Sequence, residues 1–528
     1  MIVTGSASIL DVFRPQLPSL PLAFLWLGSL VSGLAQSPVL NHAIPSAVSP
    51  GRTTHLTLSG ENFAGATELW TSFPAHVTLA PSAPATGASD SSSLGWALSV
   101  SSEVRPGIGA IRLATTNGLS NLLLLTIDDL SNATENTTNK ALRSAQYLAI
   151  PGAIDGVCEE LSFDYYQIEA QAGQQVNIDV VAHRLGSLLD PILRLLNSSG
   201  RELAYCDDAL DAYADARLSY RFPAAGRFFI EVRDTRYQGG PKYRYRLRVS
   251  ESPLDRLRLR PISEPEFVPC GASPWPERLE VEPNDSPSTA LPIPIPLSIA
   301  GTFAKEKDRD FYEFDVEKGQ RLVMAGLTRS LGFPCDLYLE LRKSNDSLVA
   351  EANVTGIDEG TITNTFTEAG TYRLLVEELN QQGGPGFGYR LDVRPQPPGF
   401  ALSVDSDKIE AAQGGSFDLK VTCLRREYAG PITLALAGGG SGNFILSDNV
   451  IPPKTNAAQV KVTVSADLPP GHMVHFTVQG RAQIEGATYE AQASTMPAIR
   501  KLFPQMLYPP PELDGLIALG VKAGRKSE

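Results

Sequence analysis

The sequence has few of the residues on which enzymes most often depend. Its 528 residues include five cysteines, spaced too widely for a disulfide scaffold or a CxxC metal site, and six histidines. It contains no HExxH and no GxSxG motif, and the pair His472 and His475 lacks the accompanying glutamate. The glycine run at residues 438–442 is not followed by the Lys-Ser or Lys-Thr of a phosphate loop. These absences predict a protein that is not an enzyme.

Positive charge is also scarce. Lysine and arginine number 45 against 58 aspartates and glutamates, which gives a formal net charge of −13. An acidic chain is poorly suited to bind nucleic acid or an anionic membrane surface, and it is better suited to bind cations. Nucleic acid is therefore excluded from the expected partners.

Long apolar runs are confined to the N-terminal region. Residues 20–35 (LPLAFLWLGSLVSGLA) have the length of a signal-peptide core and are short for a membrane span. Small residues precede Gln36, so cleavage after Ala35 is expected, leaving a mature chain without a membrane span. The alternative, a buried apolar helix, is disfavoured by Pro21 and Gly28. The location predicted is extracytoplasmic: periplasm, cell surface or secreted.

Apart from this run, the chain shows no helical periodicity. Its 40 prolines and 45 glycines are scattered among short runs in which apolar and polar residues alternate, as at residues 176–180 and 228–232. The length allows about three to five domains. An all-β chain of tandem β-sandwich modules is predicted.

Two segments of the chain are copies of each other. DYYQI at residues 164–168 corresponds to DFYEF at 310–314, and both copies continue through a Gly-Gln turn, a Leu-Gly pair and a Gln-Gly-Gly-Pro turn. They end in YRLRV and YRLDV. Each copy is long enough for about eight strands, so each is predicted to be one jelly-roll-like sandwich.

The repeated motifs resemble the bacterial pre-peptidase C-terminal (PPC) domain. Its hallmarks are an Asp-Tyr-Tyr or Asp-x-Tyr strand, an Ala-Gly-Gln turn, a Leu-Tyr-Leu strand and a late Gly-Thr-Tyr strand. Copy two has most of them, including Leu-Tyr-Leu at residues 337–339 and Gly-Thr-Tyr at 370–372; copy one has Ala-Gly-Gln at 172–174. The resemblance implies bacterial β-sandwiches that accompany secreted peptidases and other exported proteins, usually as non-catalytic appendages.

The remaining segments also show alternating apolar residues. Residues 36–130 resemble an immunoglobulin-like IPT/TIG module, and the segment around residues 417–421 and 460–464 suits an immunoglobulin-like sandwich. The predicted organisation is a signal peptide (1–35), an IPT/TIG-like sandwich (36–130), PPC-like copy one (131–251), a linker (252–277), PPC-like copy two (278–394), an immunoglobulin-like sandwich (400–495) and a mostly disordered tail (496–528).

An oxygen-rich segment stands ahead of copy two. Hard cations such as Ca²⁺ take six to eight oxygen ligands. The segment resembles the linker by which calcium-binding members of the family, including collagen-binding domains of bacterial collagenases, hold Ca²⁺. That resemblance implies a calcium site; the alternative is a solvated acidic linker. Copy one offers fewer carboxylates at the same place. The predicted ligands are Glu280, Glu282, Asn284, Asp285, Asp308 and Asp310.

Aromatic residues gather near the last hairpin of each copy. They can stack on sugars or pack on a protein ligand, although alternating tyrosines in a strand are also typical of cross-strand packing. The predicted ligand-binding residues are Tyr237, Tyr243, Tyr245, Phe387 and Tyr389.

Taken together, these patterns predict an exported bacterial protein that binds polysaccharide or protein ligands at the cell surface or envelope. Two alternatives remain open: a structural spacer, and an accessory subunit of a secreted peptidase or other hydrolase. The ligand itself is not indicated by any motif.

Overall fold

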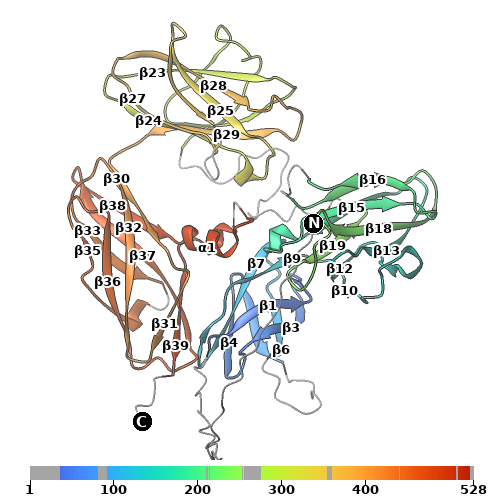
Figure 1. Ribbon diagram of the computed structural model, residues 1–528. Helices are drawn as coiled ribbons and strands as arrows, with labels where there is room; N and C mark the ends of the chain where they lie inside the picture. The colour runs from blue at the N-terminus through green and yellow to red at the C-terminus, as the bar shows by residue number, and fades with distance from the viewer. Residues whose placement is uncertain are drawn as a thin grey trace, which may run out of the picture. The chain divides into compact units, whose positions relative to one another are not determined.

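The computed structural model describes residues 36–80, 92–209, 212, 214–252, 254, 275–353, 359–438, 441–506 and 509–523. The predicted signal peptide (1–35) and most of the predicted linker lie outside these residues. Strand accounts for 54% of the structure and helix for 5%, so the prediction of an all-β protein of sandwich modules is confirmed (Figure 1). Within the described ranges, no helix has the length and apolar character needed to cross a membrane.

The first module is a sandwich of two sheets, ordered β1-β3-β6-β5 and β2-β9-β7-β4, with β8 paired to β7. Alternating residues of its strands point inward, so that Leu56 and Leu58 pack with Trp96 and Leu98 in one core. Its strands are β1 (Val39–Ile44), β2 (Ala47–Val48), β3 (Thr53–Glu61), β4 (Ala66–Thr71), β5 (Ala75–Leu79), β6 (Ser93–Val100), β7 (Gly107–Thr115), β8 (Gly118–Leu119) and β9 (Leu123–Ile127).

Copy one is a sandwich of two five-stranded sheets, ordered β10-β12-β19-β14-β17 and β11-β13-β18-β15-β16. Strand β13 shows the period of two, since Tyr166 and Ile168 are fully buried. Its strands are β10 (Asn132–Thr134), β11 (Gln146–Tyr147), β12 (Gly152–Val157), β13 (Asp164–Ala170), β14 (Gln175–Val181), β15 (Pro191–Leu196), β16 (Glu202–Cys206), β17 (Arg217–Arg221), β18 (Gly226–Asp234) and β19 (Arg244–Ser250), with short 3₁₀ turns at Leu142–Ser144 and His183–Leu185.

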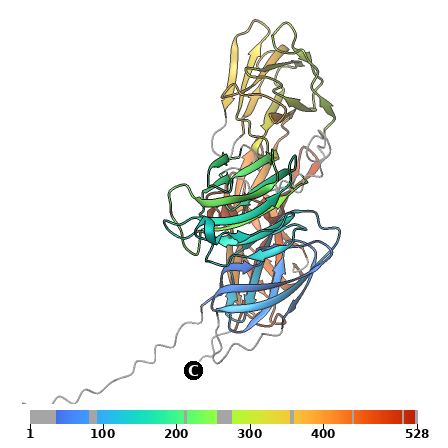
Figure 2. The same cartoon turned by 90° about the vertical axis from the view of Figure 1, so that its right-hand side faces the viewer.

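Copy two repeats this topology strand for strand, as β20-β22-β29-β24-β27 and β21-β23-β28-β25-β26. Its two sheets face each other in the yellow-to-orange part of Figure 2 and share one core. Its strands are β20 (Glu277–Leu279), β21 (Leu291–Pro292), β22 (Leu297–Thr302), β23 (Arg309–Val316), β24 (Arg321–Leu327), β25 (Leu337–Lys343), β26 (Leu348–Asn353), β27 (Thr361–Thr365), β28 (Gly370–Glu378) and β29 (Gly388–Pro395), with a 3₁₀ turn at Arg329–Leu331.

The fourth module contains a sheet whose main path is β31-β39-β37-β38-β30-β32-β36-β34, with β33 paired to β35 and β37. Its core includes Phe400, Val421 and Phe476. Its elements are β30 (Gly399–Val404), β31 (Lys408–Ala412), β32 (Ser416–Arg426), β33 (Ile432–Ala437), β34 (Phe444–Ser447), β35 (Val450–Ile451), β36 (Ala457–Val464), β37 (Met473–Ile484), β38 (Ala487–Ser494), α1 (Met496–Leu502) and β39 (Ile517–Lys522), with 3₁₀ turns at Ser441–Asn443 and Pro511–Leu513.

The prediction of a mostly disordered tail at residues 496–528 is wrong for the described residues 496–506 and 509–522. Helix α1 follows β38 directly, and β39 pairs in parallel with β31 and antiparallel with β37. The reason is burial: Ile517, Leu519 and Val521 are almost inaccessible and belong to the core of the fourth module. Apart from Pro497, near the start of α1, the prolines of the tail lie in the connection between α1 and β39.

Candidate metal centre

The oxygen-rich segment of copy two crosses one end of its sandwich. Strand β20 runs parallel to β22 and ends at Leu279, and the chain then continues through Glu280 to Asp285. The carbonyl oxygen of Asn284 accepts a hydrogen bond of 2.9 Å from the amide of Phe311, which ties the segment to β23. Because Asp310 is the second residue of β23, this tie brings its side chain beneath the segment.

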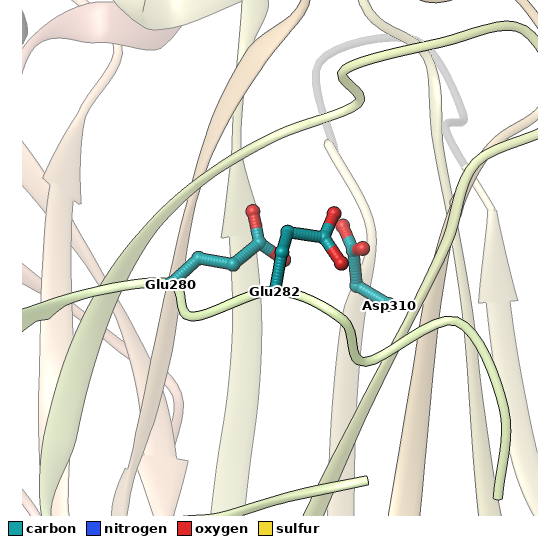
Figure 3. A group of neighbouring side chains, drawn as sticks. All are labelled: Glu280, Glu282 and Asp310. Carbon is teal, nitrogen blue, oxygen red and sulfur yellow. The ribbon is translucent and has the colours of Figure 1, made fainter. Parts of the chain in front are cut away.

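Three carboxylates meet at this point. Those of Glu280, Glu282 and Asp310 each place an oxygen within 4.8 Å of the others, and Figure 3 shows the three groups directed toward one another. Asp310 is fully buried, whereas Glu282 lies at the surface. A cluster of this kind is open to solvent on one side and closed on the other.

Glu280 is held in place by the sandwich itself. Its Oε2 accepts a hydrogen bond of 2.8 Å from the amide of Thr302 in β22. Its Oε1 accepts hydrogen bonds from Asn284 Nδ2 at 2.8 Å, from the Tyr312 hydroxyl at 3.0 Å and from the Tyr389 hydroxyl at 3.1 Å. The Tyr389 hydroxyl also lies 2.6 Å from Asp310 Oδ2. These contacts fix the positions of two of the three carboxylates.

Two buried oxygens in the cluster have no hydrogen-bond donor. They are Oδ1 of Asn284 and Oδ1 of Asp310, and both residues have no exposed surface. Buried acceptors in proteins are almost always paired, because an unpaired one costs its full desolvation free energy. Carboxylate and amide oxygens are hard ligands of the kind that Ca²⁺ prefers, so the residue types present fit this ion.

The electrostatics of the cluster are those of carboxylates that repel one another. Burial, followed by the charge of Glu280, raises the pKa of Asp310 to about 9. The pKa of Glu282 is also raised, by desolvation and by the neighbouring acidic residues. Carboxylates that repel one another in this way bind a divalent cation readily.

The other predicted ligands are placed differently. Asp285 accepts a hydrogen bond of 2.8 Å from Lys305 Nζ, at the surface. Asp308 is buried, and its Oδ2 accepts a hydrogen bond of 2.6 Å from the amide of Ala304. This bond lies within the turn that precedes β23. Neither belongs to the group of three carboxylates, so among the predicted ligands the geometry brings together Glu280, Glu282 and Asp310, with Asn284 beside them.

Copy one contains the same framework, with a lysine beside it. Glu135 Oε2 accepts a hydrogen bond of 2.9 Å from the amide of Val157, as Glu280 does from the amide of Thr302. The carbonyl oxygen of Asn139 accepts a hydrogen bond of 2.8 Å from the amide of Tyr165, so Asn139 corresponds to Asn284. The next residue is Lys140, where copy two has Asp285.

The ammonium group of Lys140 lies between the two carboxylates of copy one. It donates to Glu135 Oε1 at 3.0 Å and to Asp164, the counterpart of Asp310. Although burial alone lowers it, the pKa of Lys140 is raised overall by the charges and hydrogen bonds of Asp164 and Glu135. Sequence reasoning missed this residue, although aligning the two copies places Lys140 opposite Asp285.

The predicted ligand-binding tyrosines do not share one exposed face. Tyr245 and Tyr389 are only 2% exposed, and their hydroxyls bond to Asp164 and Asp310, so the binding-face interpretation is wrong for these two. In these two residues the alternation of tyrosines along the last strand reflects cross-strand packing, which was the alternative interpretation. Tyr243 and Phe387 pack against the cores at partly buried positions. Tyr237 is 40% exposed and lies under the Arg233 guanidinium at 4.5 Å.

One comparison with known proteins falls on copy one. Residues 162–234 match the family described as the bacterial pre-peptidase C-terminal domain. Copy one contains such a domain. Seventy residues are 37% identical to a protein of Deinococcus radiodurans described as a "probable subtilase-type serine protease". They make up 13% of this chain and 9% of that protein, so the chain matches only a small part of its relative.

Similar solved structures are more distant. A DUF4785 family protein from Legionella pneumophila is 10% identical with a TM-score of 0.15, over 37% of this chain and 60% of that one. The insect immune protein hemolin is 12% identical with a TM-score of 0.18, over 87% and 99%. Similarities at this level identify no shared function.

Proposed function

We propose that this chain is an exported, non-catalytic protein of several β-sandwich modules, and that Ca²⁺ bound by Glu280, Glu282 and Asp310 stabilises copy two. The observation that carries the calcium site is the convergence of three carboxylates, one of which, Asp310, has a buried oxygen without a partner, as does the neighbouring Asn284. A cation there gives both oxygens a partner and removes the repulsion among the acidic groups. In this proposal copy two is a second PPC domain, as its identical strand order supports.

Calorimetric titration of the chain from residue 36 onward tests the site. We expect one Ca²⁺ per chain, and we expect Glu282→Ala to abolish binding, because Glu282 supplies a charge that no neighbour replaces. The matched control is Glu135→Gln, which changes the corresponding framework of copy one and is expected to leave the stoichiometry unchanged. Equal binding by Glu282→Ala and the parent chain would reduce the segment to an acidic linker.

The role we propose for the assembled modules is to bind polysaccharide or protein at the cell surface or envelope. It is supported by the PPC match, whose family name links these domains to peptidases, and by a series of sandwich modules each with its own core. Retention on isolated cell-wall polysaccharide or matrix protein tests it, and a chain that binds neither would favour a spacer.

An accessory role beside a secreted peptidase is the second candidate. The similarity to part of the Deinococcus radiodurans protein favours this role. The match covers 9% of that protein, so it does not assign the activity of that protein to this chain. Co-purification of this chain with a peptidase encoded next to it would support this role. A gene neighbourhood without any hydrolase would count against it.

A further inference from the structure

A large cavity lies away from the carboxylate cluster of copy two. Its volume is about 880 Å³, and it is lined by β1 and the β9 region of the first module, by copy one and by the segment after α1. Sites for small organic ligands in proteins usually measure about 300 to 1,000 Å³ and often lie between domains. Residues 36–528 cluster as one compact unit, so these walls belong to one body.

Buried polar contacts hold the walls together. Arg246 of copy one donates to both carboxylate oxygens of Asp128, at 3.0 and 2.9 Å, and to Asp155 at 3.2 Å. Asp155 in turn accepts the amide of Ser46 at 2.8 Å. On the third wall, Gln505 donates to the carbonyl of Gly186 at 2.6 Å. A cavity tied on three sides in this way keeps its shape without a ligand.

One arginine in the lining has no counter-ion. The Nε of Arg244 is buried and has no hydrogen-bond partner, and no ion pair of this side chain occurs within the described residues. Burial lowers its pKa. His42 is close enough for the Arg244 charge to act on it, and its own Nδ1 is buried without a partner. An unpaired, partly desolvated guanidinium is the group that a carboxylate ligand would bind.

The acidic residues of the lining do not fill this role. Asp155 is engaged by Arg246, and Glu135 by Lys140. Glu61 and Glu159 also belong to the lining, but both are exposed to solvent. The unsatisfied charge of the interior is therefore positive.

The same cavity is lined by apolar side chains that the fold leaves open to solvent. Val39, Leu188 and Leu502 are 39%, 48% and 40% exposed, and all three line it. Leu122 and Leu124 continue the apolar wall and pack against Phe503. Exposed apolar residues that gather around one cavity are typical of a binding site.

We propose that this cavity binds a small amphipathic organic anion, an aliphatic carboxylate in chemical class. Its carboxylate pairs with Arg244, and its hydrocarbon chain covers Leu188, Leu502 and Val39. The site is independent of the calcium centre, because its charged and apolar groups belong to the first module, copy one and the segment around α1.

Titration with three ten-carbon probes of different charge tests the proposal: decanoate, decanamide and decylammonium, each below its micelle concentration. We expect decanoate to bind once per chain, and at least about tenfold more tightly than the other two, because a charge-assisted hydrogen bond to a partly desolvated guanidinium is worth about one to two powers of ten in affinity. Equal affinity for all three, or no binding of decanoate, would overturn the proposal.

Two variants locate the site. Arg244→Gln is expected to weaken decanoate binding about tenfold or more and to leave decanamide binding unchanged, whereas Arg201→Gln, at an exposed position of copy one, is expected to change neither. If Arg244→Gln does not fold, Leu188→Glu provides the test, since this exposed position tolerates a charge and a carboxylate there repels the ligand. Unchanged decanoate affinity in the folded variant would refute the site.

Discussion

Lys140 is predicted to replace a metal ion in copy one. The carboxylates that it joins are almost buried, with side-chain exposures of 6% for Glu135 and 1% for Asp164, while Lys140 itself is 24% exposed. Removing one partner of a fully buried ion pair costs about 3 to 5 kcal/mol, because the other charge loses its compensation. Since Lys140 is partly solvated, we expect Lys140→Met to destabilise copy one by about 3 kcal/mol, at the lower end of that range.

Hydrogen exchange measured by mass spectrometry reports this loss for copy one alone. A cost of about 3 kcal/mol corresponds to a fall of about a hundredfold in the protection of amides that exchange by unfolding of the domain, such as those in β12 and β13. The matched control is Lys343→Met in copy two. It removes a lysine that pairs with Glu368 at the surface, and it should leave protection unchanged. A change of less than threefold in Lys140→Met would refute the role of Lys140.

An exchange of residues between the copies extends the test. Thr137→Glu together with Lys140→Asp gives copy one the acidic residues that copy two has at the corresponding positions, Glu282 and Asp285. We expect the protection of this double variant to fall without Ca²⁺ and to recover with it, by about 2.7 kcal/mol when the free ion is at a hundred times its dissociation constant. If the double variant folds and its amide protection is the same with and without Ca²⁺, the two sites are not equivalent.

Three further predictions concern the remaining buried polar groups. Acidification from pH 7 to 4 should destabilise the fold by up to about 3 kcal/mol through His475, because burial and then the charge of Arg112 lower its pKa from 6.5 to about 4 and the unfolded chain is therefore protonated first. Urea titrations of His475→Gln should show a smaller loss of stability between these two pH values, and equal losses in the variant and the parent would refute the assignment. Arg246→Met leaves Asp155 without its buried cation and Asp128 with Arg248 alone, and it should cost about 3 kcal/mol in urea unfolding; a cost below about 1 kcal/mol would contradict this. Tyr389→Phe removes the hydroxyl that contacts Asp310 and should cost about 1 to 3 kcal/mol in thermal unfolding, whereas an unchanged melting temperature would show that the hydroxyl is dispensable.

The fold class was predictable because it depends on a local signal. The period of two in β13 and β32 places alternate residues in a core, whatever the rest of the chain does. The repeat added the equivalence of the two copies, which the identical strand orders reproduce. Strand β39 was missed because its apolar residues follow a proline-rich connection, and its burial depends on β31 and β37, which lie far away in the sequence.

The candidate site was predictable only in part. The acidic segment is contiguous in the sequence, so Glu280, Glu282 and Asn284 could be recognised from their spacing. Tyr312 and Tyr389 could not, because their hydroxyls reach Glu280 only after β23 and β29 have paired within opposite sheets. Aromatic residues in strands are usually core residues, and nothing in the sequence distinguishes those whose hydroxyl also bonds to a buried carboxylate.

The position of β39 has a consequence for how the chain is made. Because it lies between β31 and β37, the fourth module cannot close its sheet until residue 522 is available for pairing. Until then β31 and residues 473–476 of β37 lack this partner strand, and their amides and carbonyls are prone to pair with other chains. Synthesis that stops before Ile517, or proteolysis there, would therefore give a product that aggregates rather than a slightly shorter protein.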